Sequence, residues 1–343
     1  MVRRLSGIAG LASIAGLALA AQAAPSHAAT APAAAAAQPR IVLAVDGIGQ
    51  TRNLPLLVAE RLNYFREEGV MVTLVDAPAE PSVDQLVSDG RVDGAVAFYH
   101  HTFMTQAKAG VPTRSVLLMG ASPQLKLVVA SRLKDQVKSV ADLKGRRIFV
   151  GGTNSGKTTT MNWLVERAGI TNRDYQALEP TKAAAMAAAM RDGAADAIIA
   201  HEPDIGYYLS SGTAFQLADL TSVAGTRAAL GSIYPSTALY MTDAYLNGHR
   251  EDVARLVKAC LRALAYINGH SAEQIADILP PKVVGHDRAA FVAMLADDKQ
   301  AFATDGKLPV EAAHRQLEVM TALTPKYRAV NFEQTYTNNF VAP

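Results

Sequence analysis

The sequence predicts an α/β fold, and two observations carry this prediction. Between Ile41 and Met241, short apolar runs of strand length alternate with segments whose apolar residues recur at helical spacing. Beyond Asp243 the pattern is almost entirely helical. Such alternation is typical of sheets covered by helices, and 343 residues, 50% of them hydrophobic, suffice for one large or two medium domains.

Eight apolar runs are expected to form strands, at 41–45, 70–75, 94–99, 115–119, 126–130, 146–150, 196–200 and 237–241. Helices are expected at 54–65, 83–87, 155–165, 183–190, 252–268, 288–302 and 310–323, with Thr181 as N-cap of the alanine-rich helix. Cys260 is the single cysteine and falls on the apolar face of 252–268. We therefore expect a buried core thiol and no intrachain disulfide.

The N-terminus predicts secretion. Arg3 and Arg4 precede an apolar run, and small residues of an A-x-A type follow. Residues 1–29 are therefore expected to be a signal peptide, and the Ala/Pro-rich leader 30–39 to be disordered, which places the protein in the periplasm. No cysteine near the cleavage region offers a site for a lipid, and a net charge of +2 argues against a nucleic-acid partner.

The chain is organised around one stretch from Arg146 to Gly169. An apolar run is broken by Gly151 and Gly152, and small polar residues then lead into a helix. A helix N-terminus offers free backbone N–H groups and the positive end of the helix dipole, so it suits an anion. Hydroxyl groups and the cation of Lys157 would strengthen such a site.

The same stretch has an alternative interpretation. Gly151 to Thr158 matches G-x-x-x-x-G-K-[ST], the loop that cradles nucleotide phosphates. Its second strand should end in an Asp that holds magnesium, but His201 occupies that position after 196–200. An exported nucleotide-binding protein or enzyme that uses this loop therefore stays open as an alternative.

Polar and aromatic residues follow the predicted strands, where open α/β sheets bind ligands. They lie at 47–53, 99–101, 122–124, 152–158 and 201–203. Among them, His100, His101, His201 and Glu202 follow two different strands. Because adjacent residues of a strand point to opposite faces, we expect one of the two neighbouring histidines to face a ligand. A hydrogen-bonding role is favoured, and a periplasmic metal-binding protein using His100, His201 and Glu202 is a further alternative.

Four segments in register resemble the periplasmic substrate-binding proteins of ABC importers for nitrate, sulfonates, taurine and thiamine precursors. They are LPLLVAERLNYFREEGVMVTLVDA, DGRVDGAVAFYHHTFMTQAKAGVP, VADLKGRRIFVGGTNSGKTTTMNWL and MRDGAADAIIAHEPD. Their order and spacing match this group from about Ile41 to Leu264.

The resemblance implies a two-domain periplasmic-binding-protein fold of type II, with the ligand in a cleft between domains joined by hinge strands. Residues 40–124 and 236–343 would form domain one, and 125–235 domain two. Closure around the ligand would be a hinge motion. The implied partners are a small anion or organic acid, such as a sulfonate or carboxylate, and the membrane subunits of the importer, with the binding protein as a monomer.

The sequence favours a binding protein over an enzyme. No nucleophile signature such as G-x-S-x-G is present, so no catalytic residue and no cofactor are expected. Among enzymes, the thiamine-pyrimidine synthases are the nearest by this resemblance, and they carry a cysteine-rich iron motif. This chain has one cysteine and lacks such a motif.

The expected ligand-binding residues come from both predicted domains. Ser155, Lys157 and Thr158 would hold the acidic group. The full set is Gln50, Thr51, Asn53, Tyr99, His100, Ser122, Thr153, Ser155, Lys157, Thr158, His201, Glu202 and Tyr234.

Overall fold

The computed structural model describes residues 40–341 except 78–80 and 154. The predicted signal peptide (1–29) and leader (30–39) lie outside the described residues. Within the described part, none of the helices combines the length and apolar character needed to cross a bilayer.

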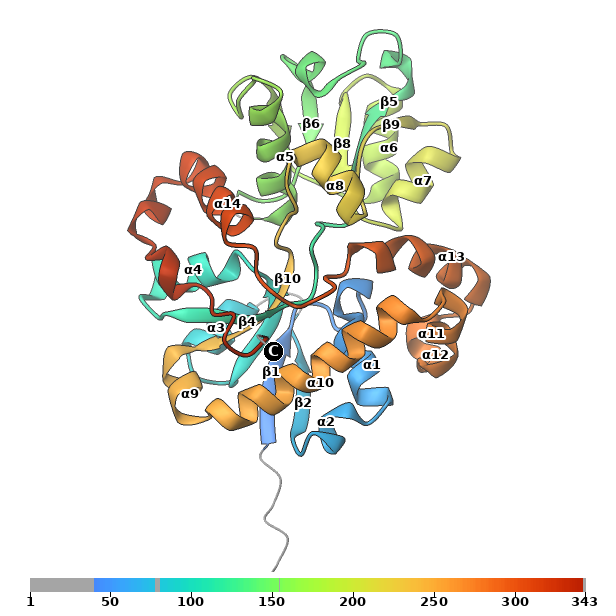
Figure 1. Ribbon diagram of the computed structural model, residues 1–343. Helices are drawn as coiled ribbons and strands as arrows, with labels where there is room; N and C mark the ends of the chain where they lie inside the picture. The colour runs from blue at the N-terminus through green and yellow to red at the C-terminus, as the bar shows by residue number, and fades with distance from the viewer. Residues whose placement is uncertain (1–39, 78–80, 154, 342–343) are drawn as a thin grey trace, which may run out of the picture. The chain divides into compact units, whose positions relative to one another are not determined.

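The first sheet has the strand order β2-β1-β3-β10-β4. Strand β1 pairs in parallel with β2 and β3, whereas β10 runs antiparallel between β3 and β4. This sheet is therefore mixed (Figure 1). Its strands are β1 (Arg40–Val45), β2 (Met71–Asp76), β3 (Gly94–Phe98), β4 (Thr113–Leu118) and β10 (Thr237–Thr242).

The second sheet has the order β7-β6-β8-β5-β9 and is also mixed. Strand β6 pairs in parallel with β7 and β8, and β5 runs antiparallel to β8 and β9. Its strands are β5 (Leu125–Ala130), β6 (Arg147–Phe149), β7 (Gln176–Leu178), β8 (Ala197–Ala200) and β9 (Ala214–Leu220). The chain enters this sheet after β4 and returns to the first sheet at β10.

Helices lie between the strands and fill the C-terminal part of the chain. They are α1 (Leu54–Arg61), α2 (Tyr64–Glu67), α3 (Val83–Ser88), α4 (His101–Ala109), α5 (Gly156–Arg167), α6 (Ala183–Arg191), α7 (Asp204–Ser210), α8 (Val223–Leu230), α9 (Asp243–Gly248), α10 (Arg250–Gly269), α11 (Ala272–Ile278), α12 (Pro281–Val284), α13 (Arg288–Asp298) and α14 (Val310–Leu323). Short 3₁₀ helices are η1 (Thr51–Asn53), η2 (Ser131–Leu133), η3 (Val140–Leu143), η4 (Lys299–Ala301), η5 (Pro325–Ala329) and η6 (Phe332–Gln334).

All eight predicted strands are present, but the prediction missed β7 and β9. Strand β7 is three residues long and mostly exposed, and β9 mixes apolar with polar residues, so neither gives a continuous apolar run. Three helix predictions needed correction. The predicted helix 54–65 is interrupted at Asn63, whose φ is +57°. The predicted helix 288–302 ends at Asp298. The N-cap of α6 is Lys182 rather than Thr181, because the helix begins at Ala183 as predicted and Lys182 directly precedes it.

Each sheet has its own apolar core. In the first, Leu43 of β1, Leu56 of α1 and Cys260 of α10 are fully buried in one cluster. This confirms the core position of Cys260, and burial raises the pKa of its thiol to about 12. In the second, Ile148 and Ile198 are buried with Met161 of α5. The domain boundaries at 124 and 235 stay a prediction.

Helix α14, near the C-terminus of the chain, packs against α5 of the second sheet. Val319 of α14 belongs to the core cluster of the second sheet, while Ala313 belongs to a cluster that contains Leu118 of β4. Arg315 adds an ion pair to Glu166 of α5, with 2.9 Å between Nη2 and Oε2. Helix α14 thus contacts both parts of the fold.

Candidate functional site

The loop between β6 and α5 has the predicted form of strand, glycine turn and helix. Ser155 is the N-cap of α5, and its Oγ accepts a hydrogen bond from the backbone N–H of Thr158 over 3.2 Å. A Cβ on Gly151 would lie 2.0 Å from Ser155 Oγ, so the loop requires glycine there. The first N–H groups of α5 have no partner within the helix, and the positive end of its dipole lies at the same point.

A cavity of about 490 Å³ opens at this helix N-terminus. We call it the cationic cavity. Residues that follow β1, β3 and β8 line it together with the α5 loop, so both sheets contribute. The lining consists of Asp46, Arg52, Phe98, His100, His101, Met104, Gly151, Gly152, Thr153, Ser155, Gly156, Lys157 and His201.

Two cationic side chains meet in the cationic cavity. Arg52 Nη2 donates to the carboxylate of Asp46 over 3.1 Å and to its carbonyl over 2.8 Å. Lys157 takes part in none of the ion pairs found among the described residues. Burial lowers the pKa of Lys157, the charge of Asp204 opposes this shift, and Arg52 adds to it. The charge of Lys157 is therefore available to an anion.

Phe98 forms a wall of the cationic cavity that connects the two sheets. It ends β3, yet its ring belongs to the core cluster of the second sheet and is 8% exposed. The Arg52 guanidinium lies 5.6 Å from the centre of this ring, a cation–π distance. A Cβ on Gly156 would lie 3.3 Å from the ring, so Phe98 packs closely on the first residue of α5.

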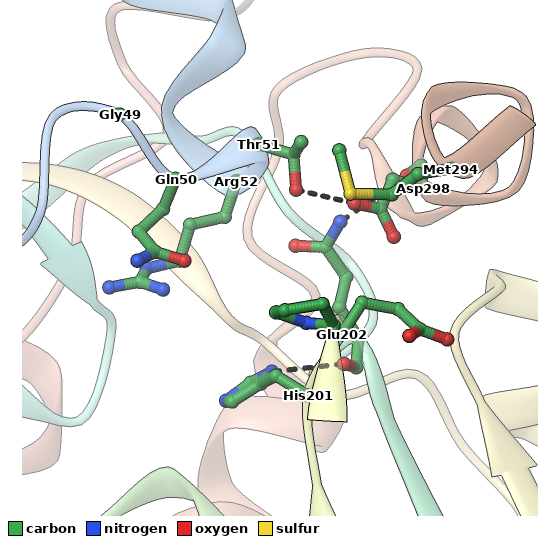
Figure 2. A pocket seen from close by; sticks show the side chains of 10 residues that line it. Gly49, Gln50, Thr51, Arg52, His201, Glu202, Met294 and Asp298 are labelled. Carbon is green, nitrogen blue, oxygen red and sulfur yellow. Dashed lines mark hydrogen bonds between the residues drawn. The ribbon is translucent and has the colours of Figure 1, made fainter. Parts of the chain in front are cut away.

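A second cavity of about 200 Å³ shares Arg52 and His201 with the first. We call it the acceptor cavity. Figure 2 shows Gln50 and Arg52 on one side of it, and Met294 and Asp298 of α13 on another. The full lining is Gly49, Gln50, Thr51, Arg52, Gln124, His201, Glu202, Pro203, Met294 and Asp298.

His201 is uncharged, and its tautomer is defined by the fold. Its Nδ1 lies 2.9 Å from the backbone carbonyl oxygen of Gln124 (Figure 2). Because a carbonyl oxygen can only accept, Nδ1 carries the proton. Burial, with the charges of Lys157 and Arg52 added to it, lowers the pKa of His201 to about 3, despite the Gln124 hydrogen bond. The other ring nitrogen, Nε2, is therefore a hydrogen-bond acceptor.

Asp298 closes the acceptor cavity from α13 and is only 5% exposed. The Thr51 hydroxyl donates to its Oδ2 (Figure 2). Burial raises the pKa of Asp298 to about 6, and the nearby carboxylates of Glu202 and Asp297 add to this rise. The Thr51 hydrogen bond and Lys126 act in the opposite direction.

The structure brings eight of the thirteen predicted site residues to these two cavities. They are His100, Thr153, Ser155, Lys157 and His201 in the cationic cavity, and Gln50, Thr51, His201 and Glu202 in the acceptor cavity. The other five are buried and line neither cavity, and their roles as ligand contacts stay predictions. Asn53 donates to the Asp46 and Gly47 carbonyls, Tyr99 bonds to Thr335, Ser122 to Leu220, Thr158 to Gly151, and Tyr234 packs on Trp163.

The expectation that only one of two adjacent histidines faces the cavity was wrong. His100 and His101 both line the cationic cavity. The chain has already left β3 at this point, because His101 is the first residue of α4 and His100 is its N-cap. Strand alternation therefore does not apply to them. His101 Nδ1 lies 3.4 Å from the buried carboxylate of Asp84.

Sequence reasoning missed several lining residues, above all Arg52 and Asp298. Arg52 lies between the predicted Thr51 and Asn53, and its charge was a signal that could have identified it. Asp298 gave no such signal, since it lies 247 residues after its partner Thr51 in a segment that shows only helical periodicity.

The metal-binding and nucleotide alternatives gain no support from these contacts. In the described part of the chain, no three His, Cys, Asp or Glu side chains gather closely enough to hold a metal ion. Thr158, which would bind magnesium in a nucleotide loop, is 8% exposed and donates its hydroxyl to the carbonyl of Gly151 over 2.7 Å.

The two mixed sheets and the cavities that both of them line define the periplasmic-binding-protein fold. A Bordetella bronchiseptica protein shares it with a TM-score of 0.71 and 26% identity, over 88% of this chain and 95% of that one. The periplasmic aliphatic sulphonate binding protein SsuA from Escherichia coli aligns over 88% and 99% with a TM-score of 0.69 and 19% identity. The periplasmic nitrate-binding protein NrtA from Synechocystis aligns over 88% and 86% with a TM-score of 0.61 and 11% identity.

The chain belongs to the NMT1/THI5 like family, whose model matches residues 50–274. This confirms the resemblance found in the sequence.

Curated relatives contradict the prediction that this protein is not an enzyme. Two of them, from Legionella pneumophila and Aspergillus parasiticus, are named 4-amino-5-hydroxymethyl-2-methylpyrimidine phosphate synthase. The first is 28% identical over 40% of this chain, which spans only 42% of that relative's length. The second is 29% identical over 66% of this chain and 67% of its own length. The family therefore includes proteins named as enzymes, and the single cysteine did not justify excluding that class.

Proposed function

We propose that this protein captures a small anion or organic acid, of the sulfonate or carboxylate type, for an ABC importer. The observation that carries the proposal is the cationic cavity, where Lys157 lacks an ion-pair partner among the described residues and lies at the N-terminus of α5. Lys157 is partly buried, and removing a cation from water is costly unless an opposite charge compensates it. An anionic ligand supplies that charge and also accepts hydrogen bonds from the free backbone N–H groups at the start of α5.

The fold supports the delivery role. Its structural neighbours include proteins whose titles describe periplasmic binding of aliphatic sulphonates and of nitrate. On this proposal the protein acts as a monomer in the periplasm, after removal of its signal peptide. Its partners are the small ligand and the membrane subunits of the importer.

A second candidate function follows from the curated relatives. They are named for the synthesis of a pyrimidine phosphate, and a phosphate group would occupy the same cationic cavity. On this candidate the chain binds an aminopyrimidine phosphate or its precursor and takes part in its formation.

Thermal unfolding of the purified protein against a ligand panel tests both candidates. The panel contains ethanesulfonate, propanoate, nitrate, sulfate, 4-amino-5-hydroxymethyl-2-methylpyrimidine phosphate, MgATP, zinc and copper. A ligand present at one hundred times its Kd adds about 2.7 kcal/mol to stability, which raises the Tm of a protein of this size by roughly 5 °C.

A shift with a sulfonate, carboxylate or inorganic anion supports the capture proposal. A shift with the pyrimidine phosphate alone favours the second candidate. Shifts confined to MgATP or to a metal would reject both.

A further inference from the structure

The acceptor cavity differs chemically from the cationic cavity beside it. The two cavities share Arg52 and His201, so one ligand can extend from one into the other. The cationic cavity offers donors, namely the ammonium group of Lys157 and the first N–H groups of α5. Apart from the shared Arg52, the acceptor cavity offers mainly hydrogen-bond acceptors, namely oxygen and nitrogen lone pairs.

The first of these acceptors is the imidazole of His201. Its Nδ1–H is used by the carbonyl of Gln124 at 2.9 Å, so the ring can only accept at Nε2 while it is uncharged. Burial, with the charges of Lys157 and Arg52 added to it, lowers the pKa of His201 and keeps the ring uncharged. His201 can therefore accept a hydrogen bond from a ligand N–H group across the whole physiological pH range.

The second acceptor is the carboxylate of Asp298. It is 95% buried, and its hydrogen-bond donor among the described residues is the neutral hydroxyl of Thr51. Neither Asp298 nor Glu202 appears among the ion pairs of the described residues. A buried carboxylate without an ion-pair partner is costly, and the neighbouring carboxylate of Glu202 adds to that cost, while the more distant charge of Lys126 offsets part of it. A cationic or N–H-rich ligand group would relieve it.

The thioether of Met294 lines the same cavity. A short apolar segment of a ligand can pack against it beside Asp298. The lining thus provides an anion site, an apolar contact and an acceptor site in adjoining space.

We infer that the natural ligand is an amine-bearing anion, whose acidic group binds at Lys157 and whose amino group binds at Asp298 and His201. This inference rests on the proposed function and names its substrate class. The expected ligands are aminoalkyl sulfonates, aminoalkyl carboxylates and aminoalkyl phosphates, or amino-substituted rings that carry one of these acidic groups. Simple anions without an amino group are expected to bind more weakly.

Calorimetric titration of the wild-type protein with matched ligand pairs tests the inference. The pairs are ethanesulfonate with 2-aminoethanesulfonate, propanoate with 3-aminopropanoate, and ethyl phosphate with 2-aminoethyl phosphate. In the pair with the preferred acidic group, the amine is expected to lower Kd at least tenfold at pH 7.5. Equal affinities within every pair would overturn the inference and leave the proposed function intact. No binding by any member of the three pairs, together with no shift by any anion of the thermal panel, would overturn both.

Two variants locate the amine. Asp298→Asn is expected to abolish the tenfold advantage of the amine, so that the two members of each pair bind this variant with equal Kd. Asp297→Asn is the matched control, since this neighbouring carboxylate is exposed, and it should keep the advantage. An advantage that survives Asp298→Asn would reject the assigned position. The wild-type comparison decides the ligand class even if that variant does not fold.

Discussion

The cationic and acceptor cavities share two side chains but surround them differently. In the cationic cavity, Arg52 and His201 lie beside an ammonium group and a helix N-terminus. In the acceptor cavity, the same two residues lie beside the carboxylates of Glu202 and Asp298. The chemical preference of each cavity therefore comes from what is added to a common centre. Three substitutions, used in four experiments, test this contrast.

Lys157→Met removes the cation that distinguishes the cationic cavity and should have the largest effect. Loss of a charge-assisted contact should weaken binding of the anion that stabilises the protein most by about a hundredfold, or ~2.7 kcal/mol. Isothermal titration calorimetry measures the change. Lys134→Met, at an exposed lysine outside both cavities, is the matched control and should bind as the wild type does. If both variants bind the anion with equal affinity, Lys157 does not contact the ligand.

Asp298→Asn should change how stability depends on pH. The pKa of Asp298 is raised to about 6 in the folded protein, so the folded state holds this proton more tightly than the unfolded chain. The protonated Asp298 therefore stabilises the folded state at low pH, and this stabilisation is lost as the pH rises through about 6. Relative to Asp298→Asn, the wild type should thus lose up to about 3 kcal/mol between pH 4 and pH 7.5.

Urea unfolding of both proteins at pH 4, 6 and 7.5 measures this difference. The titratable groups that act on Asp298 are Glu202, Asp297 and Lys126. The same urea measurements on Asp297→Asn show how much the charge of Asp297 contributes to the pH dependence. If the difference in unfolding free energy between wild type and Asp298→Asn stays constant over this pH range, the pKa of Asp298 is not raised in the folded protein.

Lys157→Met should also change the titration of His201. Burial and the charges of Lys157 and Arg52 together lower the pKa of His201 to about 3, so removing the Lys157 charge should raise this pKa. NMR of the ring protons between pH 2.5 and 8 follows the midpoint. Lys134→Met, which removes an exposed lysine outside both cavities, is the control and should leave the His201 midpoint as it is in the wild type. An unmoved His201 midpoint would show that Lys157 does not act on it.

Gly156→Ala should have the smallest effect. The new Cβ would lie 3.3 Å from the Phe98 ring, so either α5 or the ring must shift by a few tenths of an ångström. Anion affinity should fall by roughly threefold because the helix N-terminus moves with it. Phe98→Leu in the same chain should restore most of the loss. Gly269→Ala, at an open position of α10, is the control.

Local pattern predicted the half of the site that is local in sequence. The segment from β6 through Gly151 to α5 combines an apolar run, glycines and helical periodicity within some twenty residues, and the structure forms it as predicted. His201 and Glu202 were predicted because they follow β8, and ligands collect at strand ends. These elements depend on periodicity and turn chemistry, which a single sequence contains.

The other half depends on contacts between distant segments. Asp298 reaches the site because α13 lies against η1, an arrangement set by tertiary packing and invisible to helical periodicity. Phe98 is an apolar strand residue like its neighbours, and only the approach of Gly156 makes it part of a cavity wall. His100 and His101 were misjudged because β3 ends one residue earlier than the apolar run suggested.

The hydrogen bond between Thr51 and Asp298 has an evolutionary consequence. The anion-binding loop is encoded near residue 155, whereas the acceptor carboxylate is encoded almost 150 residues later, on a separate helix. Mutations in one segment leave the other untouched. On the proposed function, substitutions in α13 alone can therefore change which group is bound at the far end of the ligand, while the contacts to its acidic group stay as they are.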